Sequence, residues 1–436
     1  MIKKALVYFF VGFFASGFCL VASHLARAVS GTVDSTYKFT WSENTGWFNY
    51  GTPEGSVAVG TTELTGYAWG ENIGWISLNC SNTSSCGTVS YKVSNNGHGV
   101  LSGYAWAENV GWISFNCSNT LSCGTSNYSV TIDTTGSFSG YAWGENIGWV
   151  VFNCSTTSSC GTVDYKLQSS WVPPIPIVTA VTINGGNDIT LTPNATTTVT
   201  VSFTLTDENG CSDVFTSGNV TSTLYRSGVG SSCSADNRNC YIVATTTNNC
   251  AAGTSANATS TFQLYYFAQA TDASSSFSSQ NWLATIFARD SDGNATSGVS
   301  SGVEVNTLTA INVTTSSINY GSVNANADTG GTNQLATTTN AGNSSTTIQL
   351  FASATLTSGS NSIPTSSQHY STSTFTYAGT STALSASAAT VSGFFLTSPT
   401  STTSVSGLTY WGLAVPGGTA TGTYSGTNVF SSLFKP

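Results

Sequence analysis

Residues 66–93, GYAWGENIGWISLNCSNTSSCGTVSYKV, form a cassette that the chain repeats twice more. It returns as GYAWAENVGWISFNCSNTLSCGT from Gly103 and as GYAWGENIGWVVFNCSTTSSCGT from Gly140, so that successive copies are 37 residues apart. An incomplete earlier copy, WSENTGW at 41–47, has the tryptophan pair but no cysteines. A fixed period of this length predicts an array of supersecondary units.

Each cassette has the pattern of a tight β-hairpin. In the copy that begins at Gly103, the alternating runs 100–106 and 112–115 predict two strands. Asn109 and Gly111 between them suit the positive-φ positions of a turn. Because side chains alternate across a strand, the aromatic residues of the first run share one face of the hairpin.

The paired tryptophans have two open interpretations. In the one we favour, the indoles stack between neighbouring cassettes and supply a core that a single hairpin lacks. In the other, the turns form a glycan-binding face, because flat apolar rings beside a few polar groups suit saccharides. The residues of that candidate face are Trp69, Glu71, Asn72, Trp106, Glu108, Asn109, Trp143, Glu145 and Asn146. We expect a stack of cassettes rather than a closed ring, because four units are few for a propeller and the first copy is short.

The cysteines predict a disulfide framework. With Cys19 set aside in the N-terminal segment, the remaining ten are Cys80, Cys86, Cys117, Cys123, Cys154, Cys160, Cys211, Cys233, Cys240 and Cys250. The three C-x5-C pairs of the cassettes favour local disulfides, each contributing roughly 2 kcal/mol by loop closure. Their spacing and the lack of neighbouring histidines disfavour zinc. The other four cysteines allow three pairings, and all three stay open.

The N-terminus and the charge indicate export. Lys3 and Lys4, the apolar run 5–22 and the Ala-Arg-Ala at 26–28 predict a secretory signal over residues 1–28. An uncleaved membrane anchor is the alternative, and membrane contact is expected only in that case. Removal of three basic residues with the signal lowers the net charge from -9 to -12. This acidic balance without basic clusters argues against nucleic acid as a partner.

The length of 436 residues predicts about three domains. We expect a signal peptide (1–28), an array of four hairpin cassettes (29–170), an immunoglobulin-like β-sandwich (171–306) and a C-terminal β-sandwich (307–436). The three prolines within 171–177 predict a stiff linker between the first two folded parts. The expected fold class is therefore all-β: disulfide-stapled β-hairpin repeats followed by two β-sandwich domains of immunoglobulin-like type.

The C-terminal part shows short alternating runs without helical spacing. They predict strands at 311–313, 318–320 and 348–351. The runs 410–416 and 422–430 surround a Gly-Gly turn and predict a terminal hairpin. The weakly charged strand edges are either protected by their Ser and Thr residues or used for assembly by strand addition.

Two acidic loops offer oxygen ligands of the kind that calcium prefers. Their candidate ligands are Asp207, Asp213, Asp290, Asp292 and Asn294. Neither loop has the ligand spacing of an EF-hand, and acidic turns between strands are common without metal. We therefore expect no cofactor, with calcium as the alternative.

The inventory of reactive residues disfavours catalysis. Beyond the predicted signal the chain keeps only His98 and His369, in different predicted domains, and its cysteines are expected to be paired. The repeated glutamates fall one per cassette rather than in the couples that a glycosidase needs. We therefore expect that the chain is not an enzyme.

The GYAW-x-EN-x-GWI cassettes with their cysteine loops, over residues 37–167, resemble those of exported repeat-bearing surface proteins of candidate-phylum ultra-small bacteria. The ending YWGLAVPGGTATGTYSGTNVF is similar to the last strands of bacterial surface and pilus-type β-sandwich domains. The resemblance implies an envelope location and no reaction. We expect a secreted or cell-surface protein with a structural or adhesive role, whose partners are other envelope components or itself. A glycan-binding adhesin that uses the cassette turns is the alternative.

Overall fold

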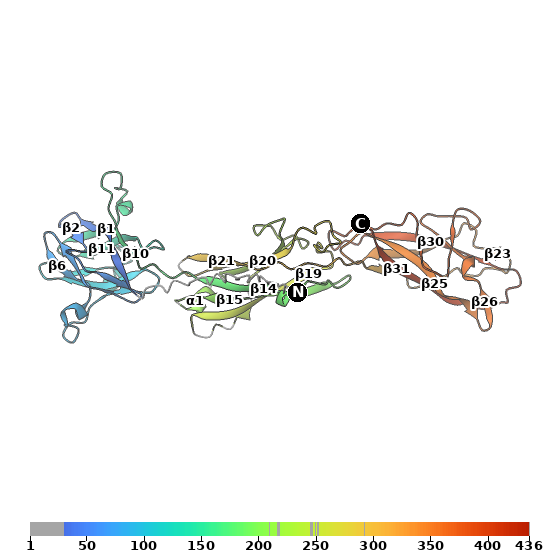
Figure 1. Cartoon of the computed structure of the whole chain (residues 1–436), viewed down its shortest axis with the longest axis horizontal. Coiled ribbons are helices and arrows are strands. Elements are labelled where there is room, and N and C mark those ends of the chain that lie inside the picture. The colour runs from blue at the N-terminus through green and yellow to red at the C-terminus, as the bar shows by residue number, and fades with distance from the viewer. Residues whose placement is uncertain are drawn as a thin grey trace, which may run out of the picture. The chain divides into compact units, whose positions relative to one another are not determined.

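The computed structural model describes residues 30–435 except 209, 216–218, 245, 246, 249, 251, 252 and 292 (Figure 1). As expected, the fold is all-β, and the single α-helix within these residues is the short α1 (Cys211–Phe215). The predicted signal peptide lies outside the described residues. No described helix is both long and apolar enough to cross a membrane. The chain divides between Pro173 and Pro174 into two compact units, which are described separately below.

The four cassette hairpins of the first unit close into an eight-stranded barrel. The hairpins are β1 (Ser30–Ser42) with β2 (Gly46–Asn49), β5 (Tyr67–Gly70) with β6 (Gly74–Ser77), β8 (Leu101–Ala107) with β9 (Gly111–Ser114), and β11 (Phe138–Gly144) with β12 (Gly148–Val151). Each hairpin pairs with the next, and β12 returns to β1 with Val151 opposite Trp41. The expected open stack is therefore wrong. Closure pairs the two edge strands that a stack leaves open.

Short strands extend the wall of the barrel. They are β3 (Ala58–Gly60), β4 (Leu64–Thr65), β7 (Val93–Asn95), β10 (Val130–Ile132) and β13 (Leu167–Ser169). The strands β7, β10 and β13 pair with the first halves of β8, β11 and β1, and β3 pairs with the start of β1. Trp171, which was expected in the linker, is buried in the core of this unit.

The barrel core consists mainly of aliphatic side chains and phenylalanines, with Tyr50 and Trp171 also buried in it. The inward-facing positions of the eight strands include Phe48, Ala68, Ile76, Ala105, Ile113, Ala142 and Val150, each at most 3% exposed. A barrel of eight strands has an interior just wide enough for side chains to fill, and here alanines from one strand of a hairpin face larger residues from the other. The tryptophans occupy the alternate, outward-facing positions, and none of the eight is buried. The favoured interpretation of the indoles as the core is therefore wrong.

The backbone structure requires the glycine that opens each GYAW motif. Gly103 has φ +81°, and a Cβ added there would lie 2.1 Å from the backbone oxygen of Lys92. Gly66 and Gly140 have the same conformation and an equally close backbone neighbour. A residue with a side chain is excluded by both the backbone conformation and the lack of space.

Three disulfides staple the cassettes at the predicted positions. The loops begin with the 3-10 helices η1 (Cys80–Thr83), η2 (Cys117–Thr120) and η3 (Cys154–Thr157), and the bonds join Cys80 to Cys86, Cys117 to Cys123 and Cys154 to Cys160. In the first loop the side chain of Asn79 caps η1 by accepting a hydrogen bond from the Ser81 N–H. Because each bond closes a short loop within one cassette, it stabilises that cassette locally.

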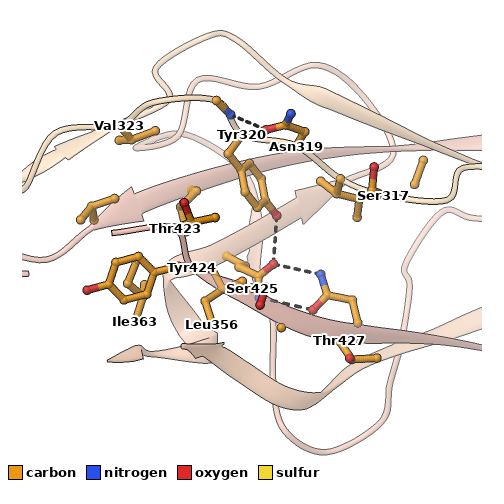
Figure 2. A pocket seen from close by; sticks show the side chains of 18 of the residues that line it. Ser317, Asn319, Tyr320, Val323, Leu356, Ile363, Thr423, Tyr424, Ser425 and Thr427 are labelled. Atoms are coloured by element: carbon orange, nitrogen blue, oxygen red, sulfur yellow. Dashed lines mark hydrogen bonds between the residues drawn. The ribbon is translucent and has the colours of Figure 1, made fainter. Parts of the chain in front are cut away.

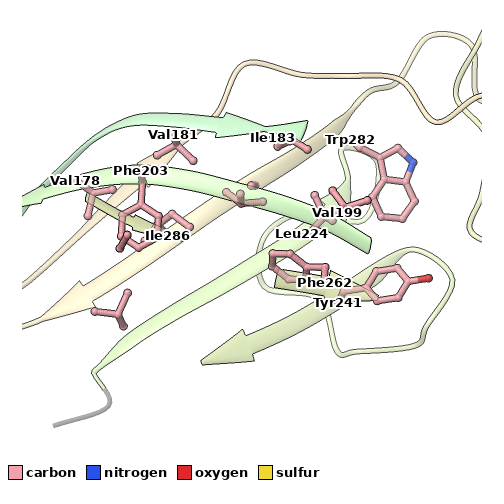
Figure 3. Packing of buried hydrophobic residues seen from close by; sticks show 14 of the residues in the cluster. Val178, Val181, Ile183, Val199, Phe203, Leu224, Tyr241, Phe262, Trp282 and Ile286 are labelled. Atoms are coloured by element: carbon pink, nitrogen blue, oxygen red, sulfur yellow. The ribbon is translucent and has the colours of Figure 1, made fainter. Parts of the chain in front are cut away.

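The first half of the second unit is a two-sheet antiparallel sandwich. One sheet has the order β14 (Ile177–Ile183), β15 (Thr196–Thr206), β19 (Ser255–Tyr265), β18 (Thr247–Asn248). The other has the order β17 (Cys240–Ala244), β16 (Val220–Arg226), β20 (Trp282–Arg289), β21 (Ala295–Val299). Figure 3 shows Phe203, Phe262 and Trp282 in the core between these strands. Of the three pairings left open, the structure has Cys211 with Cys250 and Cys233 with Cys240. The short helix η4 (Asn184–Gly186) follows β14.

The second half of this unit also has two sheets. The larger contains β22 (Ile311–Val313), β23 (Ala327–Asp328), β24 (Gln334–Asn340), β27 (Gln368–Ser371), β28 (Thr382–Ala383) and β30 (Ser406–Val415). The smaller contains β25 (Thr346–Ser358), β26 (Asn361–Ile363), β29 (Ala389–Thr390) and β31 (Ser425–Phe434), with η5 (Thr365–Ser367) beside it. The expected terminal hairpin is wrong, because β30 pairs with β24 and β27 while β31 pairs with β25 in the other sheet. The expected strand at 318–320 is also wrong, since these residues form part of a cavity wall instead.

Candidate binding surfaces

The outer surface of the barrel carries four cross-strand tryptophan pairs. The ring centroids are 4.7 Å apart in Trp41–Trp47, 4.9 Å in Trp69–Trp75, 4.6 Å in Trp106–Trp112 and 4.6 Å in Trp143–Trp149. The tilted and edge-to-face geometry of these pairs is the favourable arrangement for aromatic rings. The second indole of the later three pairs is well exposed: 49% for Trp75, 40% for Trp112 and 38% for Trp149. The barrel therefore presents aromatic surface to solvent on several sides.

Tyrosines join the indoles of adjacent cassettes. Tyr91, which follows the first cysteine loop, packs edge-on against Trp112 of the next cassette at 5.2 Å. The equivalent contacts are Tyr128 with Trp149 at 5.2 Å and Tyr165 with Trp47 at 5.1 Å. The indoles therefore do contact the neighbouring cassette, as predicted, but on the surface rather than in a core.

Trp75 differs from its equivalents because the incomplete first cassette lacks the cysteine loop. Among the residues that the structure describes, its ring contacts are with Trp69 and Tyr67 of its own hairpin. Within the same described part of the chain, no tyrosine of the preceding cassette covers it, and it is the most exposed tryptophan of the barrel. The Trp69–Trp75 pair is therefore the most open aromatic surface of the barrel.

The asparagines of the four turns form a ring of hydrogen bonds. Each side-chain amide donates to a backbone oxygen of the preceding turn: Asn72 to Thr45 at 3.1 Å, Asn109 to Ile73 at 3.0 Å, Asn146 to Val110 at 3.0 Å and Asn44 to Ile147 at 3.2 Å. The last bond connects the first cassette to the fourth and closes the ring. Asn109 is not in the expected positive-φ conformation, which Gly111 alone adopts in this turn. Its side-chain amide instead forms the hydrogen bond to Ile73 of the neighbouring cassette.

The glutamates of the turns face solvent. Glu71, Glu108 and Glu145 are exposed, and none of them takes part in the Lys92–Glu63 ion pair, the one found among the described residues. The nine residues of the candidate ligand face thus have two kinds of environment. The carboxylates lie open to solvent and the indoles lie partly open to it, whereas the amides are engaged in the barrel. Glycan binding by this face stays a prediction.

Three of the five candidate calcium ligands lie together in the first sandwich. Asp207 follows β15, Asp213 belongs to α1 and Asp290 follows β20, and one carboxylate oxygen of each lies within 4.8 Å of the others. Asn294 instead donates its backbone N–H and its side-chain amide to the Asp290 carboxylate, at 2.7 and 2.9 Å. Asp292 lies outside the described residues. The calcium site stays a prediction from the sequence.

A cavity of about 1010 Å³ lies in the C-terminal sandwich between the segments 313–323 and 421–430. Figure 2 shows Tyr320 reaching into it, where its hydroxyl donates to Oε1 of Gln368 at 3.0 Å. The Asn428 amide donates to the same oxygen at 2.9 Å. Burial raises the pKa of Tyr320, so that its hydroxyl stays protonated. None of the described lining residues is an acid, a histidine or a cysteine, and this wall therefore offers no general base near neutral pH.

One hydroxyl–imidazole pair lies elsewhere in this sandwich. Nδ1 of His369 is 2.8 Å from Oγ of Ser381, and burial lowers the pKa of His369. The imidazole also bonds the backbone of Ser366. In a catalytic triad a carboxylate, rather than a backbone group, orients the histidine. The pair therefore has only part of the geometry of a hydrolase site.

Comparisons with known proteins give little further information. No model of a known protein family matches the chain, and a search of curated proteins finds no match. A solved structure described as "Crystal structure of tetra-tandem repeat in extending region of large adhesion protein" aligns with 94% of this chain and 92% of its own, at 12% identity and a TM-score of 0.20. This similarity is too low to support an argument about function, which must rest on the geometry.

Proposed function

We propose that the chain is a non-catalytic adhesive component of the cell envelope, whose partners are other envelope components or a second copy of itself. The observation that carries this proposal is the set of tryptophan pairs on the outside of a closed barrel. Exposed aromatic surface of this kind marks interaction sites on soluble proteins. The five disulfides suit an oxidising, extracellular location.

Glycans are the ligand class that this surface suits best. Indole faces stack on sugar rings, and exposed carboxylates accept hydrogen bonds from sugar hydroxyls. The Trp69–Trp75 pair is the best candidate, because Trp75 is the most exposed indole of the barrel and Glu71 lies in the turn between the two strands. Trp69 and Trp75 lie directly opposite each other on the two strands of the hairpin, so both indoles project from the same face.

The test is a glycan array probed with the exported chain and with two variants. We expect Trp75→Ala to lower glycan binding at least tenfold while its free energy of unfolding changes by less than about 1 kcal/mol, as for other surface substitutions. The matched control is Val89→Ala, which removes a side chain of similar exposure from the segment that follows the first cysteine loop. Unchanged binding by the Trp75 variant would contradict the assignment of the site. An adhesive role would be contradicted if the parent chain showed none of three properties: glycan binding, self-association and retention in the envelope fraction.

The absence of catalysis is tested at the His369–Ser381 pair. A fluorophosphonate probe labels serines that a histidine activates. We expect no labelling of Ser381. Labelling that the substitution His369→Gln abolishes would overturn the non-catalytic assignment.

We further propose that the first sandwich is an immunoglobulin-like module. Its sheet orders, β14-β15-β19-β18 and β17-β16-β20-β21, place the first, second, fifth and sixth strands of the module together and the others opposite. This is the division of strands in an immunoglobulin sandwich. The two disulfides of the module differ from the immunoglobulin pattern, because neither joins the two sheets to each other. The buried Trp282 lies in the core between the sheets.

A further inference from the structure

A second cavity, of about 330 Å³, lies where the two sandwiches of the second unit meet. Two cationic residues, Arg238 and Lys435, line it together with serine and threonine hydroxyls and with amides. No acidic side chain of the described residues lines it. This lining is unusual for a chain that has 10 basic and 19 acidic residues. With nearly twice as many acids as bases, a randomly chosen set of lining residues would contain more acids than bases.

The walls of this cavity are held in place by hydrogen bonds from both sandwiches. The backbone oxygen of Arg238 accepts from the Gln269 N–H at 3.1 Å, and the Lys435 N–H donates to the Ser345 backbone oxygen at 3.1 Å. The buried Asn343 amide of the C-terminal sandwich donates to the Ala268 backbone oxygen of the first sandwich at 3.0 Å. The two cations are therefore placed by backbone bonds on opposite sides of the junction.

Acids near the cavity are already engaged by other groups. The Asp236 carboxylate accepts hydrogen bonds from the backbone N–H groups of Arg238 and Cys240, each at 2.9 Å. The Asp272 carboxylate accepts from the backbone N–H and the hydroxyl of Thr307. Neither acid lines the cavity, and neither forms an ion pair among the described residues.

The guanidinium of Arg238 retains a donor for a ligand. Its Nε is buried and has no hydrogen-bond acceptor within the described part of the chain. The charge of Arg238 also lowers the pKa of Arg226, after the larger effect of burial, and the Arg226 guanidinium packs on the Phe277 ring of the cavity wall. The charge of Asp236 acts in the opposite direction on the pKa of both arginines, but this carboxylate is held by backbone N–H groups and does not line the cavity. The charged side chains of the cavity wall itself are therefore cationic, and a buried polar donor without an acceptor costs free energy that an anion would recover.

We propose that this cavity binds a monosaccharide-sized acidic ligand, with Arg238 and Lys435 contacting its oxyanion. Its volume is at the small end of the range for small-molecule sites, about 300–1,000 Å³. The planar guanidinium binds carboxylate, sulfate or phosphate oxygens in bidentate fashion, and the ammonium adds a second charge. The surrounding hydroxyls suit a polyhydroxylated body. This site is separate from the tryptophan surface of the barrel and does not depend on its function.

The experiment is isothermal titration calorimetry on the full chain with sodium glucuronate, glucose 6-sulfate, inorganic sulfate and glucose. We expect one or both acidic sugars to bind, and glucose to bind at least tenfold more weakly than either. We expect Arg238→Gln and Lys435→Gln each to weaken the affinity of the acidic sugar about tenfold, which corresponds to about 1.4 kcal/mol. Binding of glucuronate alone assigns the site to carboxylates, and binding of glucose 6-sulfate alone assigns it to sulfates.

The control is Lys92→Gln, which removes a lysine of the first unit and should leave the affinity unchanged. Lys435→Gln keeps the test valid even if Arg238→Gln unfolds, because the Lys435 backbone bond is retained. No binding of either acidic sugar, equal binding of glucose, or unchanged affinity in the Lys435 variant would overturn the proposal. Inorganic sulfate that binds as tightly as the sugars would overturn the assignment of a sugar body.

Discussion

The barrel and the two sandwiches place tryptophan in opposite environments. In the barrel all eight indoles of the strands lie on the outer surface, and Trp75 is 49% exposed. In the sandwiches Trp282 and Trp411 are fully buried. Each buried indole N–H has an acceptor at 2.9 Å, the Gln269 backbone oxygen for Trp282 and the Thr409 hydroxyl for Trp411.

The difference follows from the space that each architecture encloses. An eight-stranded barrel encloses little more volume than its inward side chains fill, so alanine, isoleucine and phenylalanine suffice. Two sheets packed face to face leave a layer about 10 Å thick, which accommodates an indole. The strand tryptophans are therefore core residues in one unit and surface residues in the other, although both units consist of antiparallel strands. Trp171, which follows the last strand of the barrel unit, is buried in its core.

The largest expected effect distinguishes these two environments directly. We expect Trp282→Ala to lower the free energy of unfolding of its unit by about 3–5 kcal/mol, because it leaves a cavity in a packed core. Trp75→Ala should lower the stability of the barrel by less than about 1 kcal/mol. Urea unfolding followed by circular dichroism measures both. Equal losses for the two variants would contradict the contrast.

Removal of a disulfide should also destabilise the two units to different degrees. Cys211 and Cys250 are 39 residues apart, and by loop closure their bond contributes about 4 kcal/mol, against roughly 2 kcal/mol for the six-residue separation of Cys80 and Cys86. We therefore expect the double serine variant at Cys211 and Cys250 to lose more stability than the double serine variant at Cys80 and Cys86. Urea unfolding of each variant beside the parent chain measures the two losses. A larger loss from the cassette pair would show that the short staples act on the whole barrel.

The ring of turn asparagines is expected to stabilise the joints between cassettes. We expect Asn109→Ala to cost about 1 kcal/mol, because it leaves the Ile73 oxygen without this donor at the joint between two cassettes. The matched control is Glu108→Ala, at the adjacent exposed turn position, which should be close to neutral. Thermal unfolding compares the two variants. A neutral Asn109 variant would mean that strand pairing alone holds the cassettes together.

The smallest expected effect is a pH dependence in the C-terminal sandwich. Burial lowers the pKa of His369 below its usual value of 6.5, so the unfolded chain binds the proton more readily. The stability that depends on the neutral ring is present above pH 6.5 and is lost as the pH falls below that value. Thermal unfolding between about pH 5 and 7 should show this slope, and His369→Gln should reduce it. A slope of opposite sign would contradict the burial of the ring.

The repeat predicted the hairpins and their disulfides because both are local. Spacing within one cassette determines the turn, the cysteine loop and the alternation of side chains. Closure of the ring depends instead on pairing between cassettes, such as Ser77 opposite Trp106, which the period does not specify. The favoured core interpretation failed for a related reason. Both faces of each hairpin are apolar, and the alanine and isoleucine face, Ala105 with Ile113, was the one small enough for a barrel interior.

Contacts between distant segments limited the prediction of the other sites. The sequence identified two acidic loops but not that Asp207, Asp213 and Asp290 meet. It contained no signal for the cavity at the sandwich junction, since Arg238 and Lys435 are far apart in the chain and no other basic residue lies close to Lys435 in sequence. The terminal hairpin failed because β31 crosses to the second sheet, which a short Gly-Gly turn does not reveal.

The most direct test of the account is oxidative footprinting of the tryptophans by mass spectrometry on the folded chain. The closed barrel with outward indoles predicts rapid modification of Trp75, Trp112 and Trp149, and protection of Trp282 and Trp411 until the chain unfolds. Protection of Trp75 to the same degree as Trp282 would contradict the account, because it would place the indoles of the repeat in a core.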